Sequence, residues 1–300
     1  TDGLKPSQRK ILYSAFKKGL KDHDHEIKVS QFSGYISQIT EYHHGEVSLE
    51  GAIVSMAQTF VGSNNIPLLI EDGNFGSRNK GGADSAASRY IYTYLNPISE
   101  KIFKPEDNNC PNVLEYLVEE GIQIEPKYYC PVIPMILVNG ATGIGTGWST
   151  SVPCWNPKQI IEYLKSRLLN KKPKLPSVYY NGFKGEIIET KTKIITRGII
   201  NEIKNGFEIT ELPIGTWTFD YKEYLCKLRE QGVIKTYEEH HGLNDVHFKI
   251  LLTPSQMKSI DTNKDSLLKF FKLESSISLT NMTMFTPDNK IKVYTSVKDI

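Results

Sequence analysis

The chain has 300 residues, of which 39% are hydrophobic and 23% are charged, and its formal net charge is +2 at pH 7. This composition is typical of globular domains and excludes disordered and fibrous proteins, and the length predicts two domains. The longest apolar run, residues 132–138, is far shorter than the roughly 20 residues that span a bilayer, so we expect no membrane partner.

Helical spacing of apolar residues predicts three short helices in the first 60 residues. The first begins at Pro6, the second covers about 29–39 and the third about 48–60. Three helices followed by a hairpin-like segment are typical of a winged helix-turn-helix, which places one helix in the DNA major groove. Residues 1–22 hold six basic and two acidic side chains. They could form a phosphate-facing surface or simply a solvated helix face.

Residues 70–83 are rich in Gly, Asn and Asp, which predicts a loop with several glycines at positive φ. The loop leads into Arg89-Tyr90. A tyrosine phenol can attack phosphorus, and a neighbouring arginine can hold the same phosphate. Tyr92 and Tyr94 offer the same chemistry, and any of the 16 tyrosines could be structural. The residues alone therefore leave the choice open.

The second half of the chain predicts an α/β domain, and the whole chain an α+β fold. We expect a buried strand over 132–138 and a glycine loop over 140–147. Strands are then predicted at 185–189, 193–196 and 206–212, and helices at 157–169, 221–231 and 253–270.

The glycine loop 140–147 follows an apolar run, as a dinucleotide-binding turn does. Residues 148–153 cannot form the helix that such a turn requires, so we reject nicotinamide and flavin binding. Ile144 stands between two glycines. It could wedge between DNA base steps, or it could be buried in its own domain.

The adjacent histidines His43 and His44 point in different directions and do not make a bidentate metal site. They could contact a phosphate or could be plain turn residues. The four cysteines are widely spaced, so we expect neither a zinc site nor a disulfide scaffold.

Six segments in one order resemble the DNA breakage–reunion region of eukaryotic-type type II topoisomerases. They are residues 2–10, 42–46, 61–65, 73–93, 143–149 and 212–217, and the resemblance covers essentially the whole chain. It implies a winged-helix domain over 1–132, a tower domain over 133–285 and the start of a connection to a coiled coil over 286–300. Since the chain begins at Thr1, we expect it to belong to a longer protein.

The resemblance also implies roles for single residues. Tyr90 matches the tyrosine that becomes linked to a 5′ phosphate of DNA, and Arg89 matches the neighbour that holds that phosphate. Arg9 and His44 match residues that contact the DNA backbone, and Ile144 matches an isoleucine that intercalates and bends DNA. The further candidates for DNA binding are Lys10, His43, Arg78 and Lys80.

The implied enzyme is an ATP-hydrolysing DNA topoisomerase, an isomerase that acts on double-stranded DNA as a homodimer. Its Mg²⁺ ligands would lie in a TOPRIM domain and its ATP site in an ATPase domain, both outside these 300 residues. The triplet Asp22-His23-Asp24 has the spacing of the TOPRIM motif but follows the opening motif, so we expect a solvated turn and no metal ligand.

Two alternatives stay open. One is a module that binds and bends DNA without cleaving it, and the other is a gyrase-type subunit. The many Lys, Asn and Ile residues suggest an AT-rich genome, such as that of a protist or a large DNA virus. The expected location is the nucleus, or the host cytoplasm for a viral protein.

Overall fold

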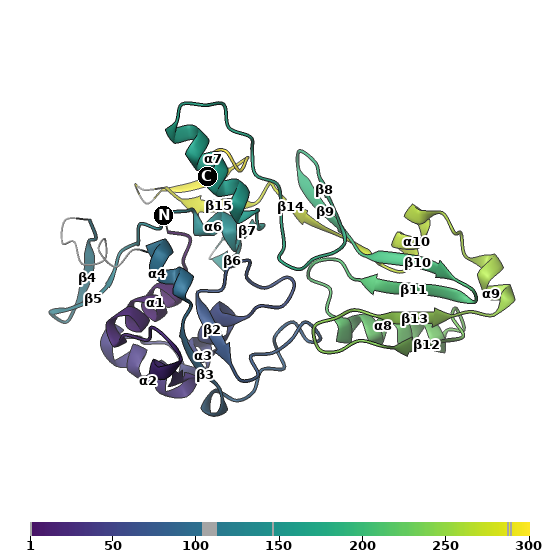
Figure 1. Ribbon diagram of the computed structural model, residues 1–300, viewed down its shortest axis with the longest axis horizontal. Helices are drawn as coiled ribbons and strands as arrows, with labels where there is room; N and C mark the ends of the chain where they lie inside the picture. The colour runs from purple at the N-terminus through teal and green to yellow at the C-terminus, as the bar shows by residue number, and fades with distance from the viewer. Residues whose placement is uncertain (1, 104–112, 146, 287, 289) are drawn as a thin grey trace.

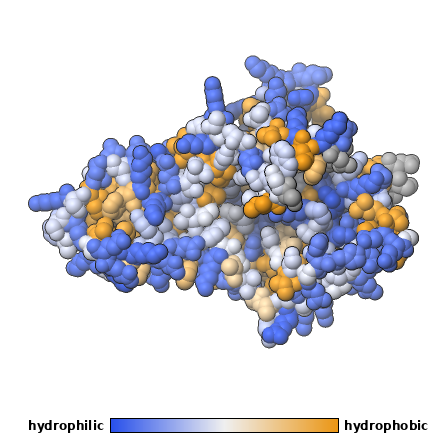
Figure 2. Space-filling view, turned by 180° about the vertical axis from the view of Figure 1, so that it is seen from behind, coloured by the Kyte–Doolittle hydropathy of each residue, from blue (hydrophilic) through white to orange (hydrophobic). Residues whose placement is uncertain are grey.

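The computed structural model describes residues 2–103, 113–145, 147–286, 288 and 290–300. Figure 1 shows an elongated molecule with the first three helices at one end and a helix-backed sheet at the other. Hydrophilic residues cover most of the reverse face, and the apolar patches between them are separate (Figure 2). Within the described residues, no helix is long and apolar enough to cross a lipid bilayer.

The three predicted helices are present and contact one another. They are α1 (Pro6–Lys18), α2 (Val29–Thr40) and α3 (Glu46–Ala57). Pro6 opens α1 at a position where a missing N–H costs nothing, and Gly19 ends it with a left-handed φ of 72°. The third helix begins and ends earlier than the predicted 48–60.

A three-stranded antiparallel sheet in the order β1-β3-β2 forms the wing beside these helices. Its strands are β1 (Ile27–Lys28), β2 (Leu69–Asp72) and β3 (Tyr92–Leu95). The 3-10 turn η1 (His23–His25) precedes β1, and η2 (Ser88–Tyr90) precedes β3. The helix α4 (Pro97–Phe103) and the hairpin of β4 (Tyr116–Glu119) and β5 (Ile122–Pro126) complete this part. The predicted loop between β2 and η2 is confirmed, with positive φ at Gly73, Gly76, Gly81 and Gly82.

The structure corrects two predictions around residue 140. The predicted strand over 132–138 is wrong, because Pro134 starts the short helix α6 (Met135–Val138) by accepting hydrogen bonds from the amides of Leu137 and Val138. The predicted glycine loop is instead a hairpin of β6 (Ala141–Gly145) and β7 (Trp148–Val152). Gly143 and Gly145 have no side chains, but their backbones still pair with β7.

The rest of the chain adds a long helix and three sheets. The helix is α7 (Pro157–Leu168). One sheet has the order β14-β9-β8, built from β8 (Glu186–Glu189), β9 (Lys193–Arg197) and β14 (Glu274–Ser278). The second has the order β10-β11-β13-β12, built from β10 (Ile199–Ile203), β11 (Gly206–Glu211), β12 (Thr236–Glu239) and β13 (Phe248–Leu251). The third is the hairpin of β15 (Met282–Phe285) and β16 (Ile291–Tyr294).

Three helices accompany the four-stranded sheet, with α8 (Thr218–Glu230) running along it in Figure 1. Helical structure is present over the predicted range 253–270, but it is divided into two helices, α9 (Pro254–Ser259) and α10 (Lys264–Phe270). Asn263 starts the second by accepting a hydrogen bond from the amide of Asp265.

The described residues form two hydrophobic cores. The first gathers buried residues from Ile11 to Ile194 together with Met282, and the second contains buried residues from Phe207 to Leu273. The first core extends across residue 132, so the predicted domain boundary does not coincide with a break between cores.

Candidate active site and nucleic-acid interface

Tyr90 is held at the surface by a buried neighbour. Ile91, directly after it, is 1% exposed, and the Ile91 carbonyl accepts a hydrogen bond from the amide of Val29 in α2 at 3.0 Å. The amide of Tyr90 donates to the carbonyl of Ala87 at 2.9 Å, which closes the turn η2. The side chain of Tyr90 is 68% exposed. The phenol is therefore presented to solvent on a backbone that is fixed on both sides.

The two competing tyrosines lie in the strand that follows. Tyr92 and Tyr94 are half-buried in β3, the central strand of the wing. Lys28 Nζ lies 5.7 Å from the ring centre of Tyr92, and the ring of His23 meets that of Tyr94 edge-on. Both rings therefore contact neighbouring side chains of the wing and are less exposed than the ring of Tyr90.

Arg89 supplies a positive charge next to the phenol. Its guanidinium carbon lies 5.0 Å from the ring centre of Tyr90, and its side chain is exposed. An exposed arginine beside an exposed phenol can hold two oxygens of a phosphate that the phenol oxygen approaches.

The glycine-rich loop before Tyr90 packs against the second half of the chain. A Cβ atom on Gly81, whose φ is +59°, would lie 2.3 Å from the Trp217 ring, so only glycine fits there. Phe60 meets the same ring edge-on at 5.8 Å. Residues 81 and 217 belong to two of the segments singled out in the sequence, and this contact joins them.

Two of the predicted DNA-binding side chains lie on this loop. Arg78 is buried and forms an ion pair with the buried carboxylate of Glu211, so it lies inside the protein instead of on the predicted surface. Lys80 is exposed, and its Nζ lies 4.9 Å from the ring centre of Phe219. The difference arises because Glu211, which is distant in sequence, supplies a buried partner for Arg78.

Two basic residues of the opening segment, Arg9 and Lys10, form ion pairs. Arg9 donates from Nε and Nη2 to both oxygens of Asp2, at 2.8 and 3.0 Å, and its side chain is 15% exposed. Burial works against ionisation of Asp2, but the hydrogen bonds and charge of Arg9 lower the pKa of that carboxyl below its ordinary value. Lys10 Nζ lies 2.9 Å from an oxygen of Glu125, which is buried. Arg9 is thus oriented by a buried carboxylate, whereas Lys10 is used in packing.

His43 and His44 lie in the turn just before α3, and both are exposed. His43 Nε2 lies 2.9 Å from Glu119 Oε1 of the β4–β5 hairpin. The ring of His44 meets that of Tyr42 at 5.3 Å and otherwise faces solvent. The amides at the start of α3 carry partial positive charge, which favours an anion beside His44.

Ile144 lies near the tip of the β6–β7 hairpin and is 92% exposed. It pairs with Ser149 across the hairpin, and the flanking glycines leave it without bulky neighbours in the strand. Asn281 braces the hairpin, because its carbonyl accepts from the amide of Ser151 and its side chain donates to Ser149 Oγ at 2.9 Å. Of the two possibilities left open by the sequence, the structure excludes a buried Ile144.

A polar hollow of about 300 Å³ brings together residues of four of the six segments. Lys5 and Gln8 line it from the opening segment, Asn64 from the third, Gly81 from the glycine-rich loop and Trp217 from the last. Segments that are far apart in sequence therefore meet beside the loop that leads to Tyr90.

Asn65 has a structural role that its sequence does not indicate. Its side-chain nitrogen donates to the carbonyls of Val138 and Tyr179, both at 2.9 Å, and its side-chain oxygen accepts from the amide of Asn181 at 2.8 Å. Asn139 adds a reciprocal pair of bonds with the backbone of Ile66. These amides fasten the third segment to the second half of the chain, a role that only the assembled fold reveals.

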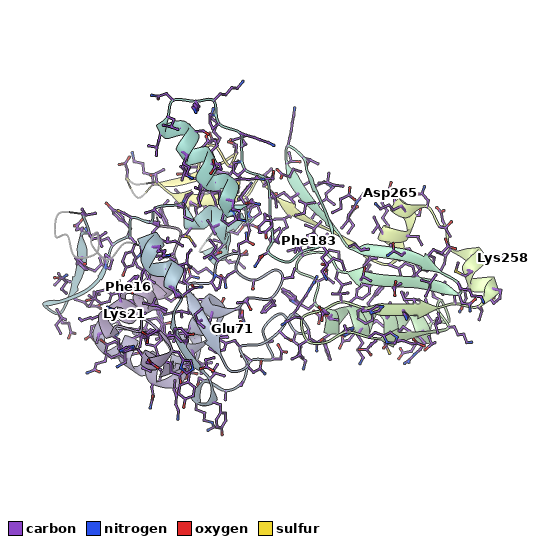
Figure 3. All side chains as sticks on the ribbon, in the orientation of Figure 1. Phe16, Lys21, Glu71, Phe183, Lys258 and Asp265 are labelled. Carbon is purple, nitrogen blue, oxygen red and sulfur yellow. The ribbon has the colours of Figure 1, made fainter. Side chains whose placement is uncertain are left out.

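A larger pocket of about 480 Å³ lies away from all these residues. It is lined from α1, β3, α4 and the β4–β5 hairpin, and Phe16 and Lys21 mark its position in Figure 3. None of the predicted site residues lines it, so its size does not make it the reaction site.

Comparison with known proteins identifies the family. A family model described as the A subunit of DNA gyrase/topoisomerase IV matches residues 1–300. The chain belongs to this family of type II topoisomerases. Its topoisomerase relatives include the mitochondrial DNA topoisomerase 2 of Dictyostelium discoideum, which is 48% identical over 303 residues, and the DNA topoisomerase 2 of Plasmodium falciparum, which is 47% identical over 306 residues.

The whole chain is covered in both cases, but it spans only 23% and 21% of these topoisomerases. The chain is also similar to the crystal structure of the Plasmodium falciparum topoisomerase II DNA-binding, cleavage and re-ligation domain, with a TM-score of 0.93 and 45% identity. That match covers 99% of this chain and 40% of the other. The α+β fold and the resemblance to eukaryotic type II topoisomerases are therefore confirmed.

Proposed function

We propose that this chain forms the DNA gate of an ATP-dependent type II topoisomerase, in which Tyr90 cleaves and rejoins double-stranded DNA. The observation that supports this most directly is the exposed phenol of Tyr90 beside the exposed guanidinium of Arg89, in a member of this family. The relatives named DNA topoisomerase 2 favour the eukaryotic enzyme over a gyrase-type subunit.

The reaction that fits this geometry is a transesterification. The Tyr90 oxygen loses its proton and bonds to the scissile phosphorus, and the 3′ oxygen of the neighbouring nucleotide leaves and takes up a proton. Arg89 stabilises the negative charge that develops on the phosphate oxygens while the bond to phosphorus is exchanged. The phosphotyrosyl ester at the 5′ end retains the energy of the broken bond, so attack by the 3′ hydroxyl reverses the step without an energy source.

The DNA-binding surface would extend from Tyr90 to the exposed His44, Lys80 and Ile144 and to Arg9, whose side chain is 15% exposed. Arg9, His44 and Lys80 would contact the phosphate backbone, and Ile144 would insert between base steps from the hairpin tip. The hydrogen-bonded His43 would flank this surface. Arg78 and Lys10 would act inside the protein, where Glu211 and Glu125 hold them.

The remaining features of the proposal concern the longer protein. We place the winged-helix domain in residues 1–132, the tower in 133–285 and the start of the coiled-coil connection in 286–300. Two copies would cut the two strands of one duplex in the nucleus. An arginine and a phenol do not form a magnesium site, so Mg²⁺ would be held by a TOPRIM domain outside these residues. ATP would be held by an ATPase domain, also outside them.

Tyr90→Phe in the full-length protein tests the proposal, with Tyr92→Phe as the matched control. Tyr90→Phe removes only one exposed oxygen, so folding and DNA binding should persist while plasmid relaxation and the denaturant-resistant protein–DNA adduct disappear. Tyr92→Phe should retain both activities. An adduct that persists in Tyr90→Phe would refute the assignment, and DNA bending without any adduct in the unaltered protein would favour the bending module instead.

A further inference from the structure

Three potential metal ligands converge at one end of the wing, and the proposed function uses none of them. His23 comes from η1, Glu26 follows that turn directly, and Asp72 ends β2. One ligand atom of each lies within 4.8 Å of the others. In the described part of the chain, this is the one group of three or more His, Cys, Asp or Glu side chains with such an arrangement.

The distances in this cluster suit a tetrahedral ion. His23 Nε2 lies 3.4 Å from Glu26 Oε2 and 3.4 Å from Asp72 Oδ2. Two ligands about 2.0–2.1 Å from a zinc ion at the tetrahedral angle lie about 3.3–3.4 Å apart. The third separation, between Glu26 and Asp72, is within 4.8 Å, so the three ligand atoms could close around one ion after a small movement of side chains.

One oxygen of the Glu26 carboxylate has no hydrogen-bond donor among the described residues. This oxygen, Oε2, is shielded from solvent. The Asp72 carboxylate lies close by, within 4.8 Å of the other two ligand atoms. A bound cation would satisfy the shielded oxygen and remove the repulsion between the two carboxylates.

The strand register sets the position of the cluster. Asp72 pairs with Tyr92, which pairs on its other side with Lys28. Residues directly opposite in antiparallel strands share a face of the sheet, so Asp72 lies on the same face as Tyr92 and Lys28. The ring of His23 rests edge-on against Tyr94 of the same strand, which limits its rotation. Glu71, the neighbour of Asp72, marks this part of the wing in Figure 3, far from Lys258 and Asp265 at the other end of the molecule.

We propose that His23, Glu26 and Asp72 form a binding site for a divalent transition-metal ion, with Zn²⁺ as the best fit. One imidazole and two carboxylates are ligands that zinc accepts, and a water molecule would complete the tetrahedron. The ion would tie the η1 turn to β2 across the end of β3, the strand that begins two residues after Tyr90. It would thereby stiffen the backbone that presents Tyr90.

Two properties of this cluster hide it in the sequence, where we expected no metal ligand. It contains no cysteine, so cysteine spacing does not indicate it. His23 lies in the predicted solvated turn and Glu26 shortly after it, but the third ligand, Asp72, comes from a distant strand. The site does not depend on the proposed DNA chemistry, since any role that preserves the wing would preserve it.

Calorimetric titration of the full-length protein with Zn²⁺, in buffer that contains Mg²⁺, tests the inference. His25→Gln is the matched control, because His25 lies in the same turn and pairs with Asp22 instead. We expect His25→Gln to bind the same number of Zn²⁺ ions as the unaltered protein. Asp72→Asn and His23→Gln should each weaken one equivalent by at least the 10–100-fold that loss of an outer-shell partner costs.

Two further measurements make the result decisive. Co²⁺ in place of Zn²⁺ should give the intense visible absorption of a tetrahedral ion in the unaltered protein, and the two ligand variants should lose that signal. Melting without metal should show that Asp72→Asn is folded, because the change removes a like-charge contact. If it is not folded, the His23→Gln titration decides. Equal Zn²⁺ stoichiometry and affinity in the unaltered protein and the folded ligand variants would overturn the inference.

Discussion

Arg78 and Glu211 form an ion pair that is almost completely buried, with 5% and 1% of their side chains exposed. Glu211 also accepts hydrogen bonds from the amides of Leu212 and Lys184. The pair joins the loop that leads to Tyr90 to the end of β11, so the position of that loop depends on the second half of the chain.

Removing one partner of this pair should be strongly destabilising. Arg78→Ala leaves the Glu211 carboxylate buried without its cation, and such a loss costs about 3–5 kcal/mol. Denaturant unfolding monitored by circular dichroism would measure it. The control is Lys165→Ala, which breaks an exposed pair with Glu162 and should cost at most about 1 kcal/mol. Equal effects of the two changes would contradict the importance of the buried pair.

Gly81→Ala should disturb the contact with Trp217. The added Cβ would lie 2.3 Å from the ring, and such overpacking costs about 1–3 kcal/mol beyond the backbone strain. Gly19→Ala is a matched control, since Gly19 also has a positive φ, of +72°, but an added Cβ there would meet nothing within 4 Å. Comparing the two melting temperatures isolates the clash. If both variants lose the same stability, the contact tolerates a methyl group.

Ile144→Ala should reduce DNA bending while leaving stability nearly unchanged. An exposed side chain contributes little to the core, so we expect a change within about 0.5 kcal/mol. Bending measured by fluorescence transfer between the ends of a short duplex should fall, because unstacking by the wedge is lost. Ile53→Ala, in the core, should instead cost about 2–5 kcal/mol. Normal bending by Ile144→Ala would remove Ile144 from the interface.

Arg89→Ala should weaken DNA binding or cleavage equally on all sequences, since phosphate contacts carry no base information. Binding by the unaltered protein should fall steeply between about 50 and 200 mM salt through counterion release, and Arg89→Ala should reduce that slope by about one unit. Fluorescence anisotropy with two unrelated duplexes measures both. A loss confined to one duplex would point to base recognition.

Asp2→Asn should lower stability in a pH-dependent way. The pKa of Asp2 is lowered in the folded protein, so its contribution is complete above the ordinary value of about 4 and disappears as the pH falls through the lower, folded value. The difference in melting temperature between Asp2→Asn and the unaltered protein should therefore be large at neutral pH and small in strong acid. Asp24→Asn, at an exposed position, should change little at either pH. A difference that does not vary with pH would show that charge is not the cause.

The first three helices could be predicted because their signals are local: apolar residues recur at helical spacing, Pro6 opens one helix and Gly19 closes it. The errors at 132–138 and 253–270 arose where a single proline or asparagine starts a helix inside the predicted element. Pro134 begins a helix inside a run that has the composition of a strand, and Asn263 begins a second helix where one was expected.

The candidate site was predictable where a motif places neighbours in sequence side by side, as with Arg89 and Tyr90. It was not predictable where partners are distant. Nothing near Arg78 in the sequence indicates that Glu211 will bury it. In the same way, Asn65 has no local sign of the four backbone groups that it binds.

Residues 198–273 leave and re-enter the fold through a single antiparallel pair. Arg197 of β9 lies opposite Glu274 of β14, and the Arg197 guanidinium binds that carboxylate at 2.8 Å. All buried residues of the second core lie between Phe207 and Leu273. The stretch therefore resembles a domain inserted into the chain, with its two ends joined by the pairing of β9 and β14. During evolution its strands and helices could lengthen, shorten or diverge without changing the pairing of β9 with β14 or the packing of the first core. Its contacts with the glycine-rich loop, and those of Glu211 with Lys184 and of Trp217 with Phe60, would need to change in step.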